Sequence, residues 1–279
     1  MKVLLFIFSS VYLCLNLAST PSYQVKYHLL YHPDSTNLKL SKSEIILLYT
    51  KNEGSSCASE NRFKSDSIKL LIKKGILSVN DIMDSRNRYK TNFKYFVHKD
   101  YLQKENQMYE TISVQNYAFS TKNELKWIIG TEKDTLSGYS CVKATVSYAG
   151  RDYEAWFVPE IPISDGPYIF WGLPGLIVKL NDTRNHYIFT MVQLKEYDQE
   201  IMDMPVYVKQ QPLQTDRIKA FSMREDARKD PLGYFSRTTG VSFDNMTFSR
   251  NGSSESIPSK SAQADRSWDN NPLELKSMK

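Results

Sequence analysis

Residues 139–158, YSCVKATVSYAGRDYEAWFV, have the pattern of two β-strands joined by a tight turn. Apolar and polar side chains alternate on both sides of the turn, with the period of two that is typical of half-buried strands. Gly150 can take the positive φ that a tight hairpin turn requires. The stretch therefore predicts a strand over residues 139–148, a turn at residues 149–152 and a partner strand over residues 153–158.

Similar alternation predicts further strands on both sides of this hairpin. They are expected at residues 23–31, 44–49, 93–97, 107–114, 126–130, 176–180 and 186–193. Short helices are expected from a cap at Asp66 to Gly75, from Val79 to Tyr89, and from a cap at Thr215 to Pro231. Helices and strands do not alternate regularly. We therefore expect a mostly β (α+β) fold, with one large antiparallel sheet and a few short helices on one face.

The N-terminal residues are typical of a secretory signal peptide. Lys2 precedes an apolar run over residues 3–17, and small residues follow at 18–20. This run is shorter than the roughly 20 apolar residues that span a bilayer, and no later segment suits a transmembrane helix. We expect a signal peptide at residues 1–20 and a single β-rich domain at 21–248. Residues 249–279 are expected to be a mostly disordered polar tail with a short docking segment at 271–275.

Charge and cysteine content narrow the possible environments. The formal net charge is +5, and the basic residues are scattered among acidic ones. Nucleic-acid binding needs a clustered basic face, so none is expected. Two cysteines follow the expected signal peptide, Cys57 and Cys141. In an oxidising compartment they could form one disulfide, or they could remain buried thiols, and the sequence leaves both alternatives open.

The loop at residues 160–175 combines glycine, proline and aromatic side chains. Pro174 and Gly175 suit the second and third positions of a type II turn over residues 173–176, which would lead into the strand at 176–180. Gly166 and Gly172 allow the backbone to pass close to a neighbour. The loop is therefore the most distinctive irregular segment of the chain.

Residues 172–177, GLPGLI, and the segment before them resemble the GLPGLI family. Residues 31–36, YHPDST, and 271–275, NPLEL, also resemble family landmarks, so the resemblance extends over nearly the whole mature chain. It implies an exported protein of the Gram-negative envelope, in the periplasm or at the periplasmic face of the outer membrane, encoded near TonB-dependent transporters. It implies no settled activity. The expected sheet would curl into an open half-barrel, similar to periplasmic lipoprotein carriers. The motif residues with a structural role are Gly138, Tyr139, Gly166, Pro167, Gly172, Pro174 and Gly175.

The aromatic loop and the preceding hairpin have two possible roles. Their side chains can close one end of the sheet, or they can form the rim of a ligand groove or a docking surface. In the simpler alternative, an ion pair between Arg151 and Glu160 only holds the loop in place. The candidate ligand-binding or partner-binding residues are Arg151, Trp156, Glu160, Tyr168, Phe170, Trp171 and Leu173.

Catalytic and metal-binding motifs are absent from the sequence. His28 and His32 lie on an expected strand, where four residues span about 13 Å, so they cannot share one metal ion. A hydrolase would have to use Cys141, or carboxylates such as Glu160 and Asp182, and any acid-rich chain offers such pairs. We therefore expect no metal, no cofactor and no catalytic residue.

The expected function is that of a non-enzymatic periplasmic binding or accessory protein. It would hold an apolar small molecule, a peptide or a metal complex, or dock on a TonB-dependent outer-membrane transporter. The alternatives are a structural envelope protein without a ligand and, less favoured, a hydrolase.

Overall fold

The computed structural model describes residues 21–78, 88–197, 211–242 and 271–275 in full, and residues 247–250 and 253–256 by their backbone. The expected signal peptide at 1–20 and most of the expected helix at 79–89 lie outside the described residues. Within the described part of the chain, no helix is both long and apolar enough to cross a membrane.

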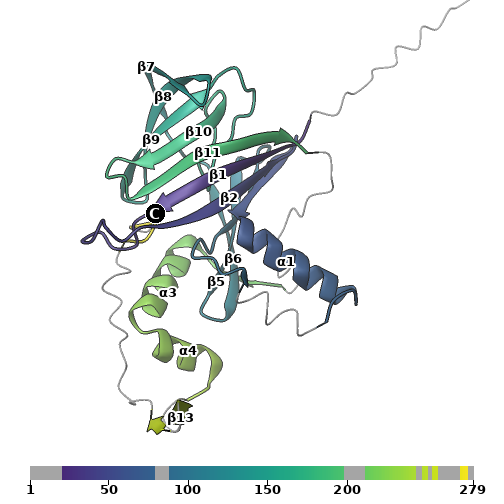
Figure 1. Cartoon of the computed structure of the whole chain (residues 1–279), viewed down its shortest axis with the longest axis vertical. Coiled ribbons are helices and arrows are strands. Elements are labelled where there is room, and N and C mark those ends of the chain that lie inside the picture. The colour runs from purple at the N-terminus through teal and green to yellow at the C-terminus, as the bar shows by residue number, and fades with distance from the viewer. Residues whose placement is uncertain are drawn as a thin grey trace, which may run out of the picture.

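One curved sheet forms the body of the protein (Figure 1). Its neighbouring strands run in the order β12-β6-β5-β4-β3-β2-β1-β11-β10-β9-β8-β7, and all pair antiparallel except β12 with β6. The end strands β12 and β7 do not pair with each other, which confirms the predicted open half-barrel. The strands are β1 (Tyr23–Tyr31), β2 (Lys42–Thr50), β3 (Gly54–Ser59), β4 (Phe96–Asp100), β5 (Glu105–Ile112), β6 (Gln115–Lys122), β7 (Ile128–Leu136), β8 (Tyr139–Tyr148), β9 (Arg151–Val158), β10 (Leu176–Asp182), β11 (Tyr187–Glu196) and β12 (Leu213–Gln214).

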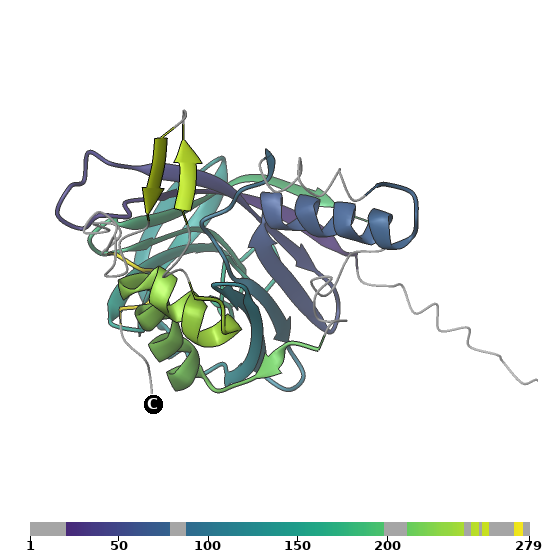
Figure 2. The same ribbon diagram turned by 90° about the horizontal axis from the view of Figure 1, so that it is seen from below.

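The helices cover both faces of the sheet, and not one face as predicted. Phe63 of α1 (Glu60–Lys73) packs in a cluster with Leu47 of β2, whereas Ala220 of α3 (Arg217–Lys229) belongs to the cluster that contains Leu48. Neighbouring strand residues point to opposite faces, so α1 lies outside the half-barrel and α3 inside. Figure 2 shows α3 and α4 (Pro231–Thr239) across the mouth of the half-barrel.

The main hydrophobic core lies on the inner face of the sheet. Val25, Tyr27 and Leu29 of β1 point into it and are almost completely buried. The loop between β9 and β10 crosses the same interior, so that Tyr168 and Phe170 join this core. The concave side of the sheet is therefore largely filled by its own loop.

In the large sheet, strands β3, β6 and β12 were not predicted. The sequence of β3, GSSCAS, is small and polar, yet all six residues are buried because β3 lies between β2 and β4. The predicted disordered tail also differs: its first part contains the short strands β13 (Thr247–Arg250) and β14 (Ser253–Ser256), which pair antiparallel. Most of the remaining tail lies outside the described residues.

Two predicted helix boundaries are wrong. Ser59 caps α1, because its hydroxyl accepts a hydrogen bond from the amide of Arg62 at 3.1 Å. Asp66, the predicted cap, lies inside that helix. Asp216 caps α3 in place of the predicted Thr215, and Pro231 begins α4.

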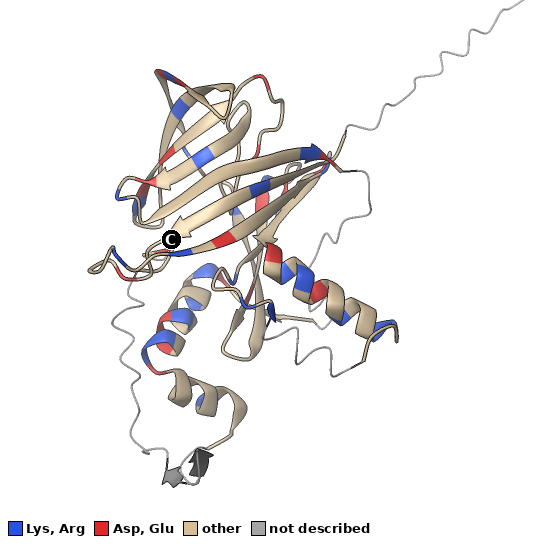
Figure 3. Cartoon of the chain, viewed as in Figure 1, with Lys and Arg blue, Asp and Glu red and all other residues tan. Residues whose placement is uncertain are grey.

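Basic and acidic side chains are interspersed over much of the described structure. Figure 3 shows both signs of charge along α1 and α3 and at scattered positions on the strands. This distribution agrees with the mixed charge pattern of the sequence.

Candidate functional site

The aromatic loop is packed inside the half-barrel. Tyr168 and Phe170 are fully buried, Leu173 is 1% exposed and Trp171 is 7% exposed. The indole of Trp171 donates a hydrogen bond to the side-chain oxygen of Asn106 at 2.8 Å. The structure therefore corrects the prediction of a ligand rim at these four loop residues, because their side chains are used to close the fold.

A buried ion pair holds this loop against β4. The ammonium of Lys99 lies 2.5 Å from one carboxylate oxygen of Asp165, and both side chains are fully buried. Lys99 also donates to the carbonyl of Gly166 at 2.6 Å, and Tyr101 donates to the second carboxylate oxygen at 2.5 Å. These bonds compensate the cost of placing two charges in the interior.

The GLPGLI signature forms a tighter turn than predicted. The amide of Gly175 donates to the carbonyl of Leu173 at 2.8 Å, which closes a three-residue turn around Pro174. The third residue of a type II turn has a φ near about +80°, but the φ of Gly175 is +152°, and the amide of Leu176 donates to the carbonyl of Ile161. The predicted type II turn is therefore wrong.

Arg151 is a buried structural residue. It begins β9 and forms an ion pair with Asp182 at 3.0 Å. Glu160 is exposed beyond the far end of β9, so the predicted Arg151–Glu160 pair is wrong. The other guanidinium nitrogens of Arg151 reach the C-terminal segment, including the side-chain oxygen of Asn271 and the carbonyl of Pro272, each at 2.6 Å.

The segment at residues 271–275 is tied to the inner wall through Glu274. This carboxylate accepts hydrogen bonds from Tyr168 at 2.8 Å and Tyr148 at 3.0 Å, and it pairs with Arg224 at 2.6 Å and Arg217 at 3.0 Å. Burial alone would raise the pKa of Glu274, but the two guanidinium groups hold it below its ordinary value. The segment therefore joins β8, the aromatic loop and α3.

The remaining predicted residues do not gather into one site. Trp156 is half-buried on β9, with the ammonium of Lys143 6.0 Å from its ring centre. Glu160 and Asp182 lie at opposite ends of the β9–β10 ladder, about 20 Å apart by strand geometry. The third hydrolase candidate, Cys141, is buried in β8. In the motif, Gly138 takes a positive φ of 84° in the β7–β8 turn, and Tyr139 begins β8.

Cys57 and Cys141 are free thiols, and both are buried. They lie on β3 and β8, which are far apart in the strand order, so the structure corrects the possible disulfide. Burial raises the pKa of the Cys57 thiol to about 11. Within the described residues, no group of histidine, cysteine and acidic side chains could hold a metal ion.

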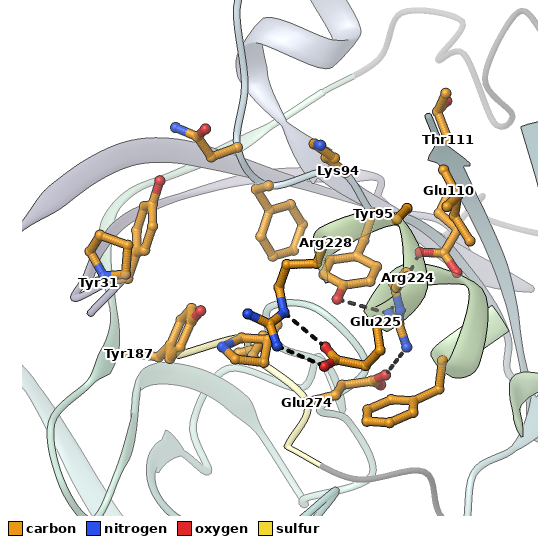
Figure 4. A pocket seen from close by; sticks show the side chains of 18 of the residues that line it. Tyr31, Lys94, Tyr95, Glu110, Thr111, Tyr187, Arg224, Glu225, Arg228 and Glu274 are labelled. Carbon is orange, nitrogen blue, oxygen red and sulfur yellow. Dashed lines mark hydrogen bonds and ion pairs between the residues drawn. The ribbon is translucent and has the colours of Figure 1, made fainter. Parts of the chain in front are cut away.

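A pocket of about 550 Å³ lies between the inner wall of the sheet, α3 and the C-terminal segment (Figure 4). Its size is typical of small-molecule sites. Phe93 and Tyr187 supply ring surface from the sheet side, and Phe221 supplies it from α3. Pro272 and Leu273 form part of the wall, so the docked C-terminal segment helps to shape the pocket.

Glu110 is a buried polar group in the lining of this pocket whose hydrogen bonding is incomplete. It lies on β5 and is 2% exposed, and its Oε1 atom has no hydrogen-bond partner among the described residues. Its Oε2 atom lies 3.5 Å from the guanidinium of Arg224, whose closer carboxylate partner is Glu274 at 2.6 Å. Burial raises the pKa of Glu110 to about 7. Such a group in a pocket wall marks a candidate binding position.

Sequence reasoning did not identify this pocket. Its residues come from the start of the chain, from β5, from α3 and from the C-terminal segment, and no local motif connects them. The sequence offered one indication of the pocket: Glu110 is an acidic residue within the predicted strand at residues 107–114.

Comparison with known proteins adds a family assignment for the central segment. Residues 149–179 match a family model described as "Protein of unknown function (Porph_ging)". This range contains Arg151, the aromatic loop and the GLPGLI signature. The resemblance to the GLPGLI family is confirmed. No curated protein matches this chain.

Solved structures confirm the β-rich fold of this chain. A structure of PNGF-II in space group P21 aligns with a TM-score of 0.52 and 13% identity, over 75% of this chain and 34% of PNGF-II. A second PNGF-II structure, in space group C2, gives a TM-score of 0.51 and 12% identity with the same coverage. The chain thus spans about a third of PNGF-II, and the likeness concerns the fold alone.

Proposed function

We propose that this GLPGLI protein is a non-enzymatic binding protein that holds a small, largely apolar ligand in the pocket beside α3. The observation that carries the proposal is Glu110, a buried carboxyl whose Oε1 atom has no partner among the described residues, in a wall that also contains several aromatic rings. Apolar pockets with a few polar groups are the usual form of small-molecule sites.

The cellular setting belongs to the same proposal. The signal-like residues 1–20 and the family resemblance support export to the periplasm or the periplasmic face of the outer membrane. The resemblance also supports a TonB-dependent transporter as the partner to which the bound ligand is passed.

Binding of the neutral fluorescent amine N-phenyl-1-naphthylamine tests the pocket. We expect saturable fluorescence enhancement with one site per chain. Phe221→Ala should weaken binding at least about fivefold, because this half-buried ring lines the pocket. Leu232→Ala on the adjacent helix α4 is the matched control, since Leu232 does not line the pocket. Absence of saturable binding, or equal effects of the two variants, would overturn the proposal.

A further inference from the structure

The charged groups around the pocket show which kind of ligand headgroup it can accept. The lining contains four bases, Lys42, Lys94, Arg224 and Arg228, and three acids, Glu110, Glu225 and Glu274. Figure 4 shows Lys94, Glu110 and Arg224 around the same space as the aromatic rings. A cationic headgroup would need one of the acids to be available.

Two of the three acids are already occupied by guanidinium groups. Glu225 accepts from Arg228 through both oxygens, at 3.2 and 2.8 Å. Glu274 is held by Arg224 and Arg217. A ligand cation would have to displace an arginine from either carboxylate. This is costly at Glu274, which is buried, and at the half-buried Glu225 the guanidinium already engages both oxygens.

Glu110, the third acid, is also a poor partner for a cation. The charged groups that act on it are Arg224 from α3, Lys94 from the segment before β4, and Glu274 from the C-terminal segment. The two bases would repel an incoming cation, and below neutral pH the buried carboxyl is mainly protonated. A protonated carboxyl donates one hydrogen bond, so a protonated Oε1 atom can donate to an acceptor atom of the ligand.

Lys94 adds a positive charge to the lining of the pocket. Its side chain is exposed, and no ion pair to it occurs in the described part of the chain. We infer, as an extension that rests on the proposed function, that the pocket binds an amphipathic carboxylate. The apolar chain of this ligand lies among Phe93, Tyr187 and Phe221, and its headgroup points toward Lys94 and Glu110. The inference depends on charge complementarity between this headgroup and the basic excess of the lining.

Three ligands with the same chain length test the inference. Dodecanoate, 1-dodecanol and dodecylammonium are compared at pH 6 as competitors of bound N-phenyl-1-naphthylamine. We expect dodecanoate to compete best and dodecylammonium worst, with about tenfold between the extremes. If the alcohol or the ammonium competes as well as the carboxylate, or if no chain competes, the inference is overturned while the pocket itself stands. If the naphthylamine does not bind, the proposed function fails first.

A charge-reversal variant separates headgroup recognition from folding. Lys94→Glu should lower dodecanoate affinity about tenfold and leave 1-dodecanol affinity unchanged. Lys133→Glu, at an exposed position on the edge strand β7, is the control and should change neither. Equal losses for the acid and the alcohol in Lys94→Glu would contradict a headgroup role for this lysine.

Discussion

At the scale of single residues, the path of the GLPGLI loop depends on Lys99 and Asp165. Both side chains are fully buried, and together they engage the hydroxyl of Tyr101 and the carbonyl of Gly166. Replacing Lys99 by methionine would leave the Asp165 carboxylate in the interior without its cation. We expect the free energy of unfolding in urea to fall by about 3–5 kcal/mol.

The matched control for Lys99→Met is an exposed ion pair of the same type. Lys122 lies 3.1 Å from Glu105, and its side chain is 68% exposed. Lys122→Met should change the free energy of unfolding by less than about 1 kcal/mol. Similar losses in the two variants would show that the buried pair has no special role in stability.

Of the two glycines in the GLPGLI signature, Gly175 is the one whose backbone conformation and close contacts most clearly require glycine. Its φ is +152°, and a Cβ atom there would lie 2.2 Å from the carbonyl oxygen of Val158. Gly138 also has a positive φ, +84°, but a Cβ there would meet nothing within 4 Å. In urea unfolding, we expect Gly138→Ala to cost about 1–2 kcal/mol and Gly175→Ala clearly more, because only the second adds a steric clash. Equal costs would mean that the loop can move away from Val158.

At the scale of elements, α1 provides a direct test of where a helix begins. The Ser59 side chain is fully buried and caps the helix at the amide of Arg62. Ser59→Ala should lower the free energy of unfolding by about 1–2 kcal/mol, because one helix-end donor loses its partner. Ser67→Ala is the control within the same helix, since its hydroxyl bonds the carbonyl of Phe63, which already belongs to the helix ladder. A larger loss from Ser67→Ala would argue against the cap.

The sequence predicts elements well where one face is buried and the other is solvated. Residues 23–31 and 139–148 alternate clearly, and the observed strands β1 and β8 have the predicted bounds. The strand β3 escaped prediction because a central strand of small polar residues shows no alternation. The cap at Ser59 was missed because the polar residues that follow it hide the start of the apolar face of α1.

The candidate site was much harder to predict than the elements. Arg151 and the aromatic loop were correctly singled out as important, but the sequence does not say whether large side chains point into a core or toward a ligand. Glu110, Arg224 and Glu274 are separated by more than 40 residues in each case and meet only through the sheet order and the docked C-terminal segment. No local sequence pattern indicates that these three residues are in contact.

At the scale of the whole molecule, other segments of the same chain fill and cover the concave side of the open sheet. The β9–β10 loop fills the concave side, α3 covers the mouth, and residues 271–275 join these parts through Arg151 and Glu274. The pocket is the space that these pieces leave beside α3. Ligand binding and overall stability should therefore be linked through the charges in its wall.

The pH dependence of stability tests this link through Glu110. Burial raises its pKa from 4.5 to about 7, so between these values the folded state retains a proton that the unfolded chain has lost. The stability from this proton is fully present below about pH 4.5 and is lost as the pH rises through about 7.

Glu110→Gln removes this dependence without changing the shape of the side chain. Relative to the wild type, the variant should gain up to about 3 kcal/mol in free energy of unfolding between pH 4.5 and pH 8. A difference between the two proteins that stays constant over this range would show that the Glu110 carboxyl does not titrate near neutral pH. The hydrogen bond from a protonated Glu110 to the ligand headgroup would then fail as well.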